Sequence, residues 1–274
     1  MLYLSRKMIF SSAHSYRKQE WTEEKNKATF GLCSNLNGHG HDYTLEVMVR
    51  GEIDPSSGIV VNITDVDQIM KAFVNEELAG KFLNKEVPYF IDHIPTTENI
   101  VSYIWMMLDK QFTDCELYKI RLRENDFLYS EKEKDLMVRL TRKYHFSTAH
   151  RLHSKQLSDE ENEALFGKCN NPYGHGHNYY LEVTVSGEVD PVTGMITDLG
   201  QLDKTVEETI LQKFDHKHLN LDTEEFKDLN PTSENVAIVI WDLLEGKISN
   251  LYKVGLYETD KNYFEYYGAD KEQF

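Results

Sequence analysis

The sequence predicts an α+β protein made of two similar domains in tandem. Shifting the chain by 136 residues, from Met1 to Met137, aligns Met1–Trp105 with Met137–Trp241 without a gap. A repeat of this length is typical of a duplicated domain rather than a solenoid. In each half, hairpin-like strands come first, two helices follow and a last strand ends the pattern, which favours an antiparallel sheet with its helices on one face. The length of 274 residues suits two domains of about 130 residues each.

Each half opens with a strand that ends near a histidine, and the second strand has the clearest pattern. Apolar and polar residues alternate along it, so one face collects the same apolar positions in both halves: Tyr43, Leu45, Val47 and Val49, then Tyr179, Leu181, Val183 and Val185. The turn signals Asp54–Gly58 and Asp190–Gly194 follow these strands. Each turn predicts a further short strand after it.

Two helices and a strand complete each half. The first helix carries apolar residues three to four positions apart, at Val66, Ile69, Met70 and Phe73. The second begins near Thr96, whose hydroxyl can cap it, and buries Ile100, Ile104, Trp105 and Leu108. A last strand through Tyr118, Ile120 and Leu122 gives four strands per half. Residues 130–135 are charged and lack apolar anchors, which predicts a linker between domains 1–129 and 137–274.

Composition excludes several classes of protein. A net charge of −16 argues against nonspecific nucleic-acid binding, because no basic stripe is present to replace phosphate counterions. The apolar runs are too short to span a membrane, and the first residues lack the apolar region of a signal peptide. Three cysteines without framework spacing predict no disulfides and fit a reducing cytoplasm.

A duplicated histidine motif predicts two metal sites. Gly38-His39-Gly40-His41 recurs as Gly174-His175-Gly176-His177, and each copy follows a third histidine, His14 or His150, by the same distance. Two strand residues with one between them point to the same side, so each pair can present two imidazoles to one ion. Three histidines leave the fourth position of a zinc ion open, as catalysis requires. A single pair of histidines is weak support for a metal site, because such pairs are often buried in a core with their hydrogen bonds satisfied. Here all three histidines keep the same spacing in both halves.

The second half resembles the 6-pyruvoyl-tetrahydropterin synthase family closely, and the first half resembles it more weakly. The matching segments are Phe146–His153, Phe166–Tyr179, Asp215–Lys217, Pro231–Asn235 and Tyr257–Asp260. The resemblance implies the T-fold, with subunits associating as barrels, and active sites at subunit interfaces. It also implies a zinc-dependent lyase that eliminates triphosphate from 7,8-dihydroneopterin triphosphate with internal side-chain redox. No nicotinamide or flavin is then expected.

The resemblance assigns a role to each site residue of the second half. His150, His175 and His177 would hold zinc, and Cys169, six residues before His175, would act as a thiolate base. Asp215 and His216 would pass protons, with the carboxylate orienting the imidazole. Glu258 would accept hydrogen bonds from the guanidine-like edge of the pterin, beside Thr232 and Ser233.

The first half keeps most of this set but not all of it. His14, His39 and His41 remain, as do Cys33 and Glu124, which matches Glu258. Ala79-Gly80 stands in place of Asp215-His216, so the proton relay is lost. This half is therefore expected to bind zinc, with pterin affinity through Glu124, and to lack turnover. A barrel of three domains cannot alternate first-half and second-half domains evenly. We therefore expect each barrel to contain like halves, in a trimer of two-domain chains.

Two other functions compete with this interpretation. The 6-carboxytetrahydropterin synthase of the queuosine pathway shares the fold, but its cysteine lies closer to the histidine pair than Cys169 lies to His175. A non-catalytic pterin-binding or scaffolding domain suits the first half alone. The spacing in the second half favours the pyruvoyl type.

Overall fold

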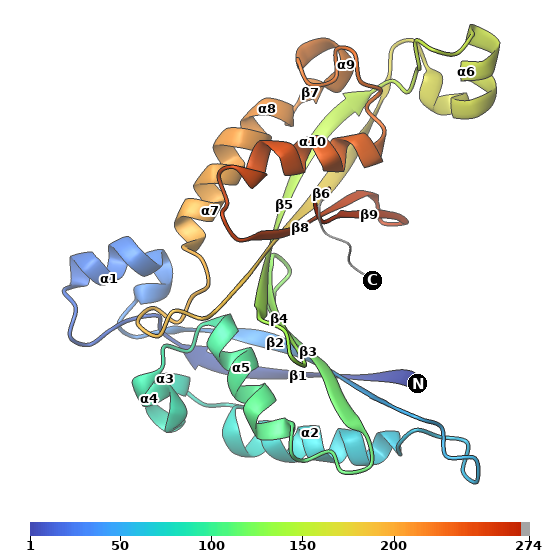
Figure 1. Ribbon diagram of the computed structural model, residues 1–274. Coiled ribbons are helices and arrows are strands. Elements are labelled where there is room, and N and C mark those ends of the chain that lie inside the picture. Colours follow the sequence, from blue (N-terminus) through green and yellow to red (C-terminus); the bar gives the residue numbers. More distant parts are fainter. Residues whose placement is uncertain (270–274) are drawn as a thin grey trace. The chain divides into compact units, whose positions relative to one another are not determined.

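The computed structural model describes residues 1–269, which form two compact units. The first contains Met1–Thr141 together with Ser186–Gly200, and the second contains Arg142–Val185 and the residues from 201 onward. The first unit therefore includes a loop from the second half of the sequence. Each unit contains an antiparallel sheet with helices, and the second unit adds one short strand that pairs in parallel (Figure 1).

The sheet of the first unit follows the chain in the order β1 (Leu2–His14), β2 (His39–Gly51), β3 (Glu116–Asn125) and β4 (Leu128–Glu133). β1 and β2 are paired over their whole length, with Leu2 opposite Gly51 and His14 opposite His39. The alternation predicted for β2 is confirmed, because its four apolar residues are fully buried. This register brings a histidine at the end of β1 against the histidine pair that begins β2.

Two long helices, α2 (Ile63–Glu77) and α5 (Thr97–Leu108), cover one face of this sheet (Figure 1). Their apolar stripes enter a single core, where Met70 and Ile104 pack with the inward residues of β2. The predicted cap of α5 is confirmed, since the Thr96 hydroxyl accepts a hydrogen bond from the Asn99 backbone at 3.2 Å. Shorter helices lie between elements: α1 (Glu23–Phe30), η1 (Gly31–Ser34), α3 (Leu83–Glu86) and α4 (Tyr89–Asp92).

The second half repeats this order of elements. Its strands run β5 (Val138–His150), β6 (His175–Gly187), β8 (Leu251–Thr259) and β9 (Asn262–Tyr266), and the short β7 (Lys217–His218) pairs with β5. Its helices are α6 (Asp159–Phe166), η2 (Gly167–Asn170), α7 (Leu199–Val206), the π-helical turn η3 (Glu207–Leu211), α8 (Gln212–Phe214), α9 (Leu219–Asp222) and α10 (Ser233–Glu245).

Two predictions about the sheet are wrong. No strand follows the turn at Asp54–Gly58 or its repeat at Asp190–Gly194. The fourth strand of each half is β4 or β9 instead, and β4 takes up most of the predicted linker at 130–135. Its charged residues misled the prediction because their partners lie on β3: Glu131 contacts Lys119 at 2.6 Å and Arg121 at 2.7 Å.

The helix before each cysteine, α1 or α6, was not predicted. The signal was present in the second half, where Ser158 and Glu161 form a reciprocal capping box at the start of α6. In the first half, Thr22 caps α1 in the same place. Among the described residues, no helix combines the length and apolarity needed to cross a bilayer.

Candidate functional site

Two triads of histidines form where neighbouring strands end and begin. His14 ends β1, His39 and His41 begin β2, and the repeat at His150, His175 and His177 has the same arrangement on β5 and β6. In each triad one ligand atom per histidine lies within 4.8 Å of the other two. The structure thus brings together the three histidines of each triad, as the sequence predicted.

The hydrogen bonds of the buried histidine fix which of its nitrogens faces the triad. His150 Nδ1 lies 2.8 Å from the carbonyl oxygen of Pro231, and His14 Nδ1 lies 2.9 Å from that of Pro95. A carbonyl can only accept, so Nδ1 carries the proton and donates. Nε2 of the neutral ring is then left with a lone pair directed at the other histidines. A carbonyl bonded to the outer ring nitrogen orients metal-binding histidines in this way.

The spacing of these nitrogens fits a tetrahedral metal ion. Nε2 of His150 lies 3.2 Å from Nε2 of His175, and the same atoms of His14 and His39 are also 3.2 Å apart. Zinc–nitrogen bonds of about 2.0–2.1 Å at a tetrahedral angle place two ligand nitrogens about 3.3 Å apart. In the first triad, His41 Nε2 is buried and makes no hydrogen bond within the described chain. The donor set therefore fits zinc, with a fourth position left open.

Burial keeps the central histidines neutral. Desolvation, followed by the nearby His39 and His41, lowers the pKa of His14 to about 3. Desolvation likewise lowers the pKa of His150 to about 4. A neutral imidazole is the form that binds metal, so burial prepares both rings as ligands at physiological pH.

A glutamate on the first strand of the last hairpin, β3 or β8, stands beside each triad. Glu258 Oε1 lies 3.9 Å from Nε2 of both His150 and His177 and accepts a hydrogen bond from the Ser233 hydroxyl at 2.8 Å. Although partial burial opposes ionisation, hydrogen bonds from Ser233 and Asn262 hold the pKa of Glu258 below its usual value. Thr232, the other predicted contact, caps α10 with its hydroxyl. The half-buried Glu258 is an ionised acceptor with room for further donors.

Glu124, the first-half counterpart, is more enclosed. Its side chain is 5% exposed, against 17% for Glu258. Its Oε2 atom accepts hydrogen bonds from the Thr97 hydroxyl at 2.7 Å and from the Tyr16 hydroxyl at 3.1 Å. Leu152 occupies the position of Tyr16 in the second half and can donate nothing. Tyr16 was not predicted as a site residue, because its only signal in the sequence is a polar aromatic residue two positions after a ligand histidine.

Asp215 and His216 are in contact and line a pocket with a ligand of the triad. His216 Nδ1 lies 2.9 Å from Asp215 Oδ2, and Ser147 donates its backbone N–H to Asp215 Oδ1 at 2.8 Å. Despite desolvation, these contacts hold the pKa of Asp215 below its usual value. His216 and His177 both line a pocket of about 440 Å³. His218 also lines it, with a buried Nδ1 that lacks a partner in the described chain, and was missed although it ends the run Asp215-His216-Lys217-His218.

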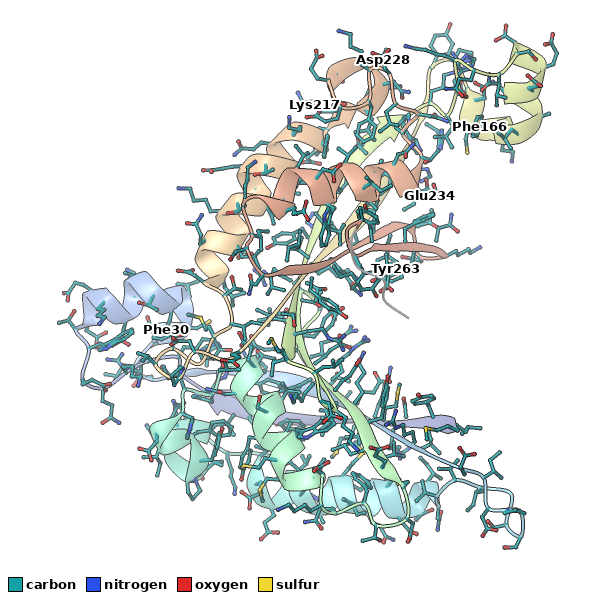
Figure 2. All side chains as sticks on the ribbon, in the orientation of Figure 1. Phe30, Phe166, Lys217, Asp228, Glu234 and Tyr263 are labelled. Carbon is teal, nitrogen blue, oxygen red and sulfur yellow. The ribbon has the colours of Figure 1, made fainter. Side chains whose placement is uncertain are left out.

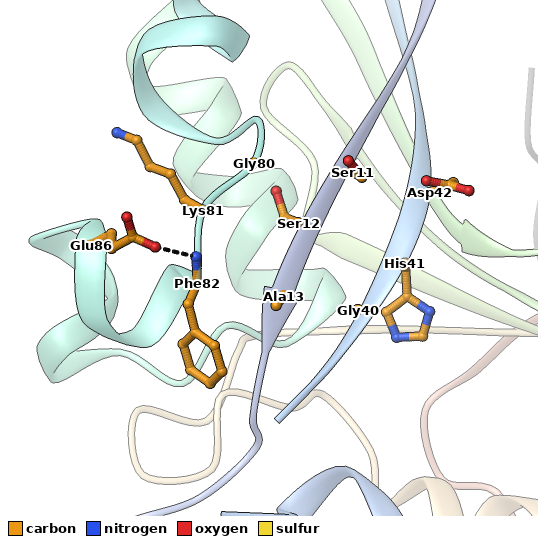
Figure 3. A pocket seen from close by; sticks show the side chains of 10 residues that line it. All are labelled: Ser11, Ser12, Ala13, Gly40, His41, Asp42, Gly80, Lys81, Phe82 and Glu86. Atoms are coloured by element: carbon orange, nitrogen blue, oxygen red, sulfur yellow. Dashed lines mark hydrogen bonds between the residues drawn. The ribbon is translucent and has the colours of Figure 1, made fainter. Parts of the chain in front are cut away.

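The first half has the matching pocket without the two histidines, His216 and His218, that line the second. This pocket of about 490 Å³ is lined by His41, with Gly80 and Phe82 at the positions of His216 and His218 (Figure 3). Gly80 has a φ of 73°, and His216 has a φ of 56° in the same left-handed region. Glycine adopts this backbone at no steric cost, so the first half retains the shape of the turn while losing its chemistry.

Each cysteine lies in the short helix before β2 or β6. The carbonyl of Cys169 accepts the backbone N–H of Leu152 at 2.8 Å, which ties η2 to the segment just after His150. Cys33 is held in the same way by Tyr16 at 2.8 Å. Both thiols are half-buried, and the two metal-binding clusters among the described residues contain histidines alone. The backbone of each cysteine is therefore tied to the residue two positions after a ligand histidine, and the thiol does not belong to the triad.

Comparison with known proteins identifies the origin of this repeated site. A human 6-pyruvoyl tetrahydrobiopterin synthase is 54% identical over 133 residues, which cover 48% of this chain and 92% of the human protein. The Caenorhabditis elegans 6-pyruvoyl tetrahydropterin synthase structure is 49% identical, covers 48% of this chain and 96% of its own, and superimposes with a TM-score of 0.47. An Archaeoglobus fulgidus protein, provisionally named a 6-carboxy-5,6,7,8-tetrahydropterin synthase, is 37% identical over 91 residues, 33% of this chain and 73% of its own. Residues 3–134 and residues 139–269 each match the family described as 6-pyruvoyl tetrahydropterin synthase, so the chain belongs to that family and carries its domain twice.

Proposed function

We propose that the chain is a zinc-dependent 6-pyruvoyl-tetrahydropterin synthase whose working site lies in the second half. The substrate would be 7,8-dihydroneopterin triphosphate, which loses triphosphate while its side chain is oxidised and its ring is reduced. The two changes balance inside the molecule, so no external redox cofactor is needed. The observation that carries the proposal is the complete second-half set, in which the triad, Glu258 and the Asp215–His216 pair coexist in one unit.

The side chains of this set divide the work between binding and proton transfer. Glu258 would accept hydrogen bonds from the pterin edge, since each of its oxygens has one partner and capacity for another. Zinc, when bound at His150, His175 and His177, would supply Lewis-acid polarisation of the side-chain hydroxyls. Cys169 would remove a proton from the substrate side chain, and His216, oriented by Asp215, would return one.

The first half would serve as a zinc-binding structural domain that does not turn over. Gly80 cannot transfer protons, and the Tyr16 hydroxyl occupies Glu124 Oε2, where a pterin would have to bind. With Thr97 and Tyr16 both bound to Glu124 Oε2, this half offers a pterin less than the match to Glu258 suggested.

Purified protein should contain two zinc ions per chain, because both triads have the same nitrogen spacing. Elemental analysis of protein grown with zinc measures this directly. Stripping the metal with a chelator should abolish triphosphate release from 7,8-dihydroneopterin triphosphate, and added zinc should restore it. If the unmodified protein contained one zinc ion, and this ion were lost in His175→Ala but kept in His39→Ala, the first triad would not bind zinc. Release that persists in metal-free protein would contradict the proposed function.

The substrate triphosphate needs positively charged side chains near the second site. The four candidates, which differ in the partners they already have, are Arg142, Lys143, Arg151 and Lys168. Arg142 is bound to Asp203 at 3.0 Å, and Arg151 donates to Asn170 at 3.0 Å, whereas Lys168 is exposed. Lys143 lies over the rings of Tyr180 and Tyr257, at 5.0 Å and 4.9 Å. Strand alternation places it on the same face of β5 as Ser147, a wall of the pocket.

Lys143→Ala should therefore raise KM about fivefold with little change in kcat, the effect of losing one exposed ion pair of ~1 kcal/mol. The salt dependence of KM should also flatten. Steady-state kinetics at two ionic strengths measure both effects. Lys7→Ala, the equivalent change in the first half, is the matched control and should leave KM unchanged. An unaltered KM in the Lys143 variant would exclude this lysine from triphosphate binding.

A further inference from the structure

The loop at residues 54–60 has the same backbone as the loop at residues 190–196. In the first, Asp54 N–H donates to Ile59 O at 3.0 Å, and in the second, Asp190 N–H donates to Met195 O at 3.0 Å. Gly58 and Gly194, at the same place in each loop, have φ values of 74° and 75°. The two loops are therefore equivalent in shape, and their environments can be compared residue by residue.

The loop at residues 190–196 belongs to the first unit and docks on the N-terminus of α5. The Thr96 hydroxyl donates to Gly194 O, and Ile196 N–H donates to Glu98 Oε1 at 3.2 Å. Met195, only 7% exposed, enters a cluster formed by Tyr16, Phe30 and Ile94, which Cys33 also contacts. This loop therefore covers the helix start and the cysteine side of the first-half site.

The second half repeats the backbone of this docking surface, with Leu152, Phe166 and Asn230 at the positions of Tyr16, Phe30 and Ile94, and the described residues leave it open. Thr232 caps α10 with φ and ψ of −65° and 157°, close to the −68° and 160° of Thr96 at α5. Asn235 donates to Asn230 O at 2.8 Å, as Asn99 donates to Ile94 O at 2.8 Å. Yet Glu234 is exposed where Glu98 is 2% exposed, and Phe166 is half-buried where Phe30 is buried (Figure 2).

The loop at residues 54–60 likewise has no docking partner among residues 1–269. Ile59 is 48% exposed, whereas the equivalent Met195 is 7% exposed. A Cβ atom added at Gly194 would lie 2.6 Å from Asn99 Nδ2, whereas one added at Gly58 would meet no atom of the described chain within 4 Å. The chain thus presents one loop and one surface of matching shape, both unfilled.

We propose that the loop at residues 54–60 of one chain docks on the Thr232–Glu234 surface of a second copy of this chain and completes its second-half site. Val60 N–H would donate to Glu234, Gly58 O would accept from Thr232, and Ile59 would pack against Phe166 on the side of Cys169. Because Ser233, within this surface, holds Glu258 at 2.8 Å, the loop would close the site next to its pterin-binding carboxylate.

This contact joins unlike halves, since a loop on the first half of one chain meets a helix start on the second half of another. The contact is heterologous, and repeated heterologous contacts form a ring when their rotations close. The loop at residues 190–196 makes its contact within a chain, and the loop at residues 54–60 would make the equivalent contact between chains. A single chain would then have an incomplete second-half site.

Ile59→Asp tests the proposal through assembly. An unpaired carboxylate in the docked position should weaken association of the chains by about 100-fold or more, measured by sedimentation equilibrium over a range of concentrations. Ile91→Asp, at an apolar residue that is 66% exposed in α4, is the matched control and should assemble like the unmodified protein. Equal association of the two variants, or an unmodified protein that sediments as one 32.0 kDa chain, would overturn the proposal.

Mixing two inactive variants tests whether the loop acts between chains. Ile59→Asp lacks the loop contact and keeps its site, whereas Glu258→Ala lacks the site and keeps its loop. After random exchange of chains, about a quarter of the second-half sites would be intact and receive an intact loop from a neighbour, so about a quarter of the activity should return. No recovery, with mixed oligomers confirmed by mass, would show that the loop acts within its own chain and overturn the proposal.

The activity readout rests on the proposed function, and the sedimentation readout does not. If the unmodified chain releases no triphosphate but Ile59→Asp alone dissociates, the proposed function fails while the docking stands. If triphosphate is released at the same rate by Ile59→Asp and by the unmodified chain, the docking fails while the proposed function stands.

Discussion

His216→Ala should lower the rate of triphosphate release by about two to four orders of magnitude, the usual contribution of general acid–base catalysis. Cys33→Ala should leave the rate per chain unchanged. The difference follows from the two pockets: His216 and its partner Asp215 line the second, whereas Gly80 takes that place in the first. Initial rates with 7,8-dihydroneopterin triphosphate at saturating concentration measure both effects.

Backbone strain needs a separate control, because His216 has a φ of 56°. Asparagine tolerates this region better than alanine, so His216→Asn should fold normally and remain as inactive as the alanine variant. His93→Ala removes an exposed histidine that stacks on Tyr89 and should keep full activity. If Cys33→Ala halved the rate per chain, the first-half site would be working, and the assignment of that half as structural would be wrong.

Cys169→Ala should abolish product formation while both zinc ions stay bound. The thiol is proposed as the base, and the second triad contains three histidines without it. Removing the base should therefore cost about two to four orders of magnitude in kcat. On the same preparation, metal analysis measures the zinc content, circular dichroism measures the fold, and single-turnover kinetics measure the chemical step. Loss of one zinc together with the fold would instead make Cys169 a fourth ligand and the site a structural one.

Local patterns were enough to predict that the histidines converge in two triads and which strand faces are buried. The histidines lie at strand ends, where a two-residue period and a fixed offset determine which side chains converge. The capped helix at Thr96 and the fully buried residues of β2 follow from equally short-range rules. These predictions succeeded because each depends on neighbours in sequence.

Features that depend on distant partners were missed or wrong. Strand β4 resembled a linker because its charges are matched by Lys119 and Arg121 on β3. Tyr16 gains its importance from Glu124, 108 residues away, and Met195 from a cluster in the other half of the sequence. None of these pairings has a local signature, so the enclosure of the first-half site became visible only in the fold.

The identity of the product tests the central claim most directly. Zinc-loaded protein incubated anaerobically with 7,8-dihydroneopterin triphosphate should release triphosphate and 6-pyruvoyl-tetrahydropterin in equal amounts, identified by mass spectrometry, with no added redox cofactor. His216→Asn, incubated in parallel, should leave the substrate intact. A product with the mass of 6-carboxytetrahydropterin, or substrate that stays unchanged with fully zinc-loaded protein, would contradict the account.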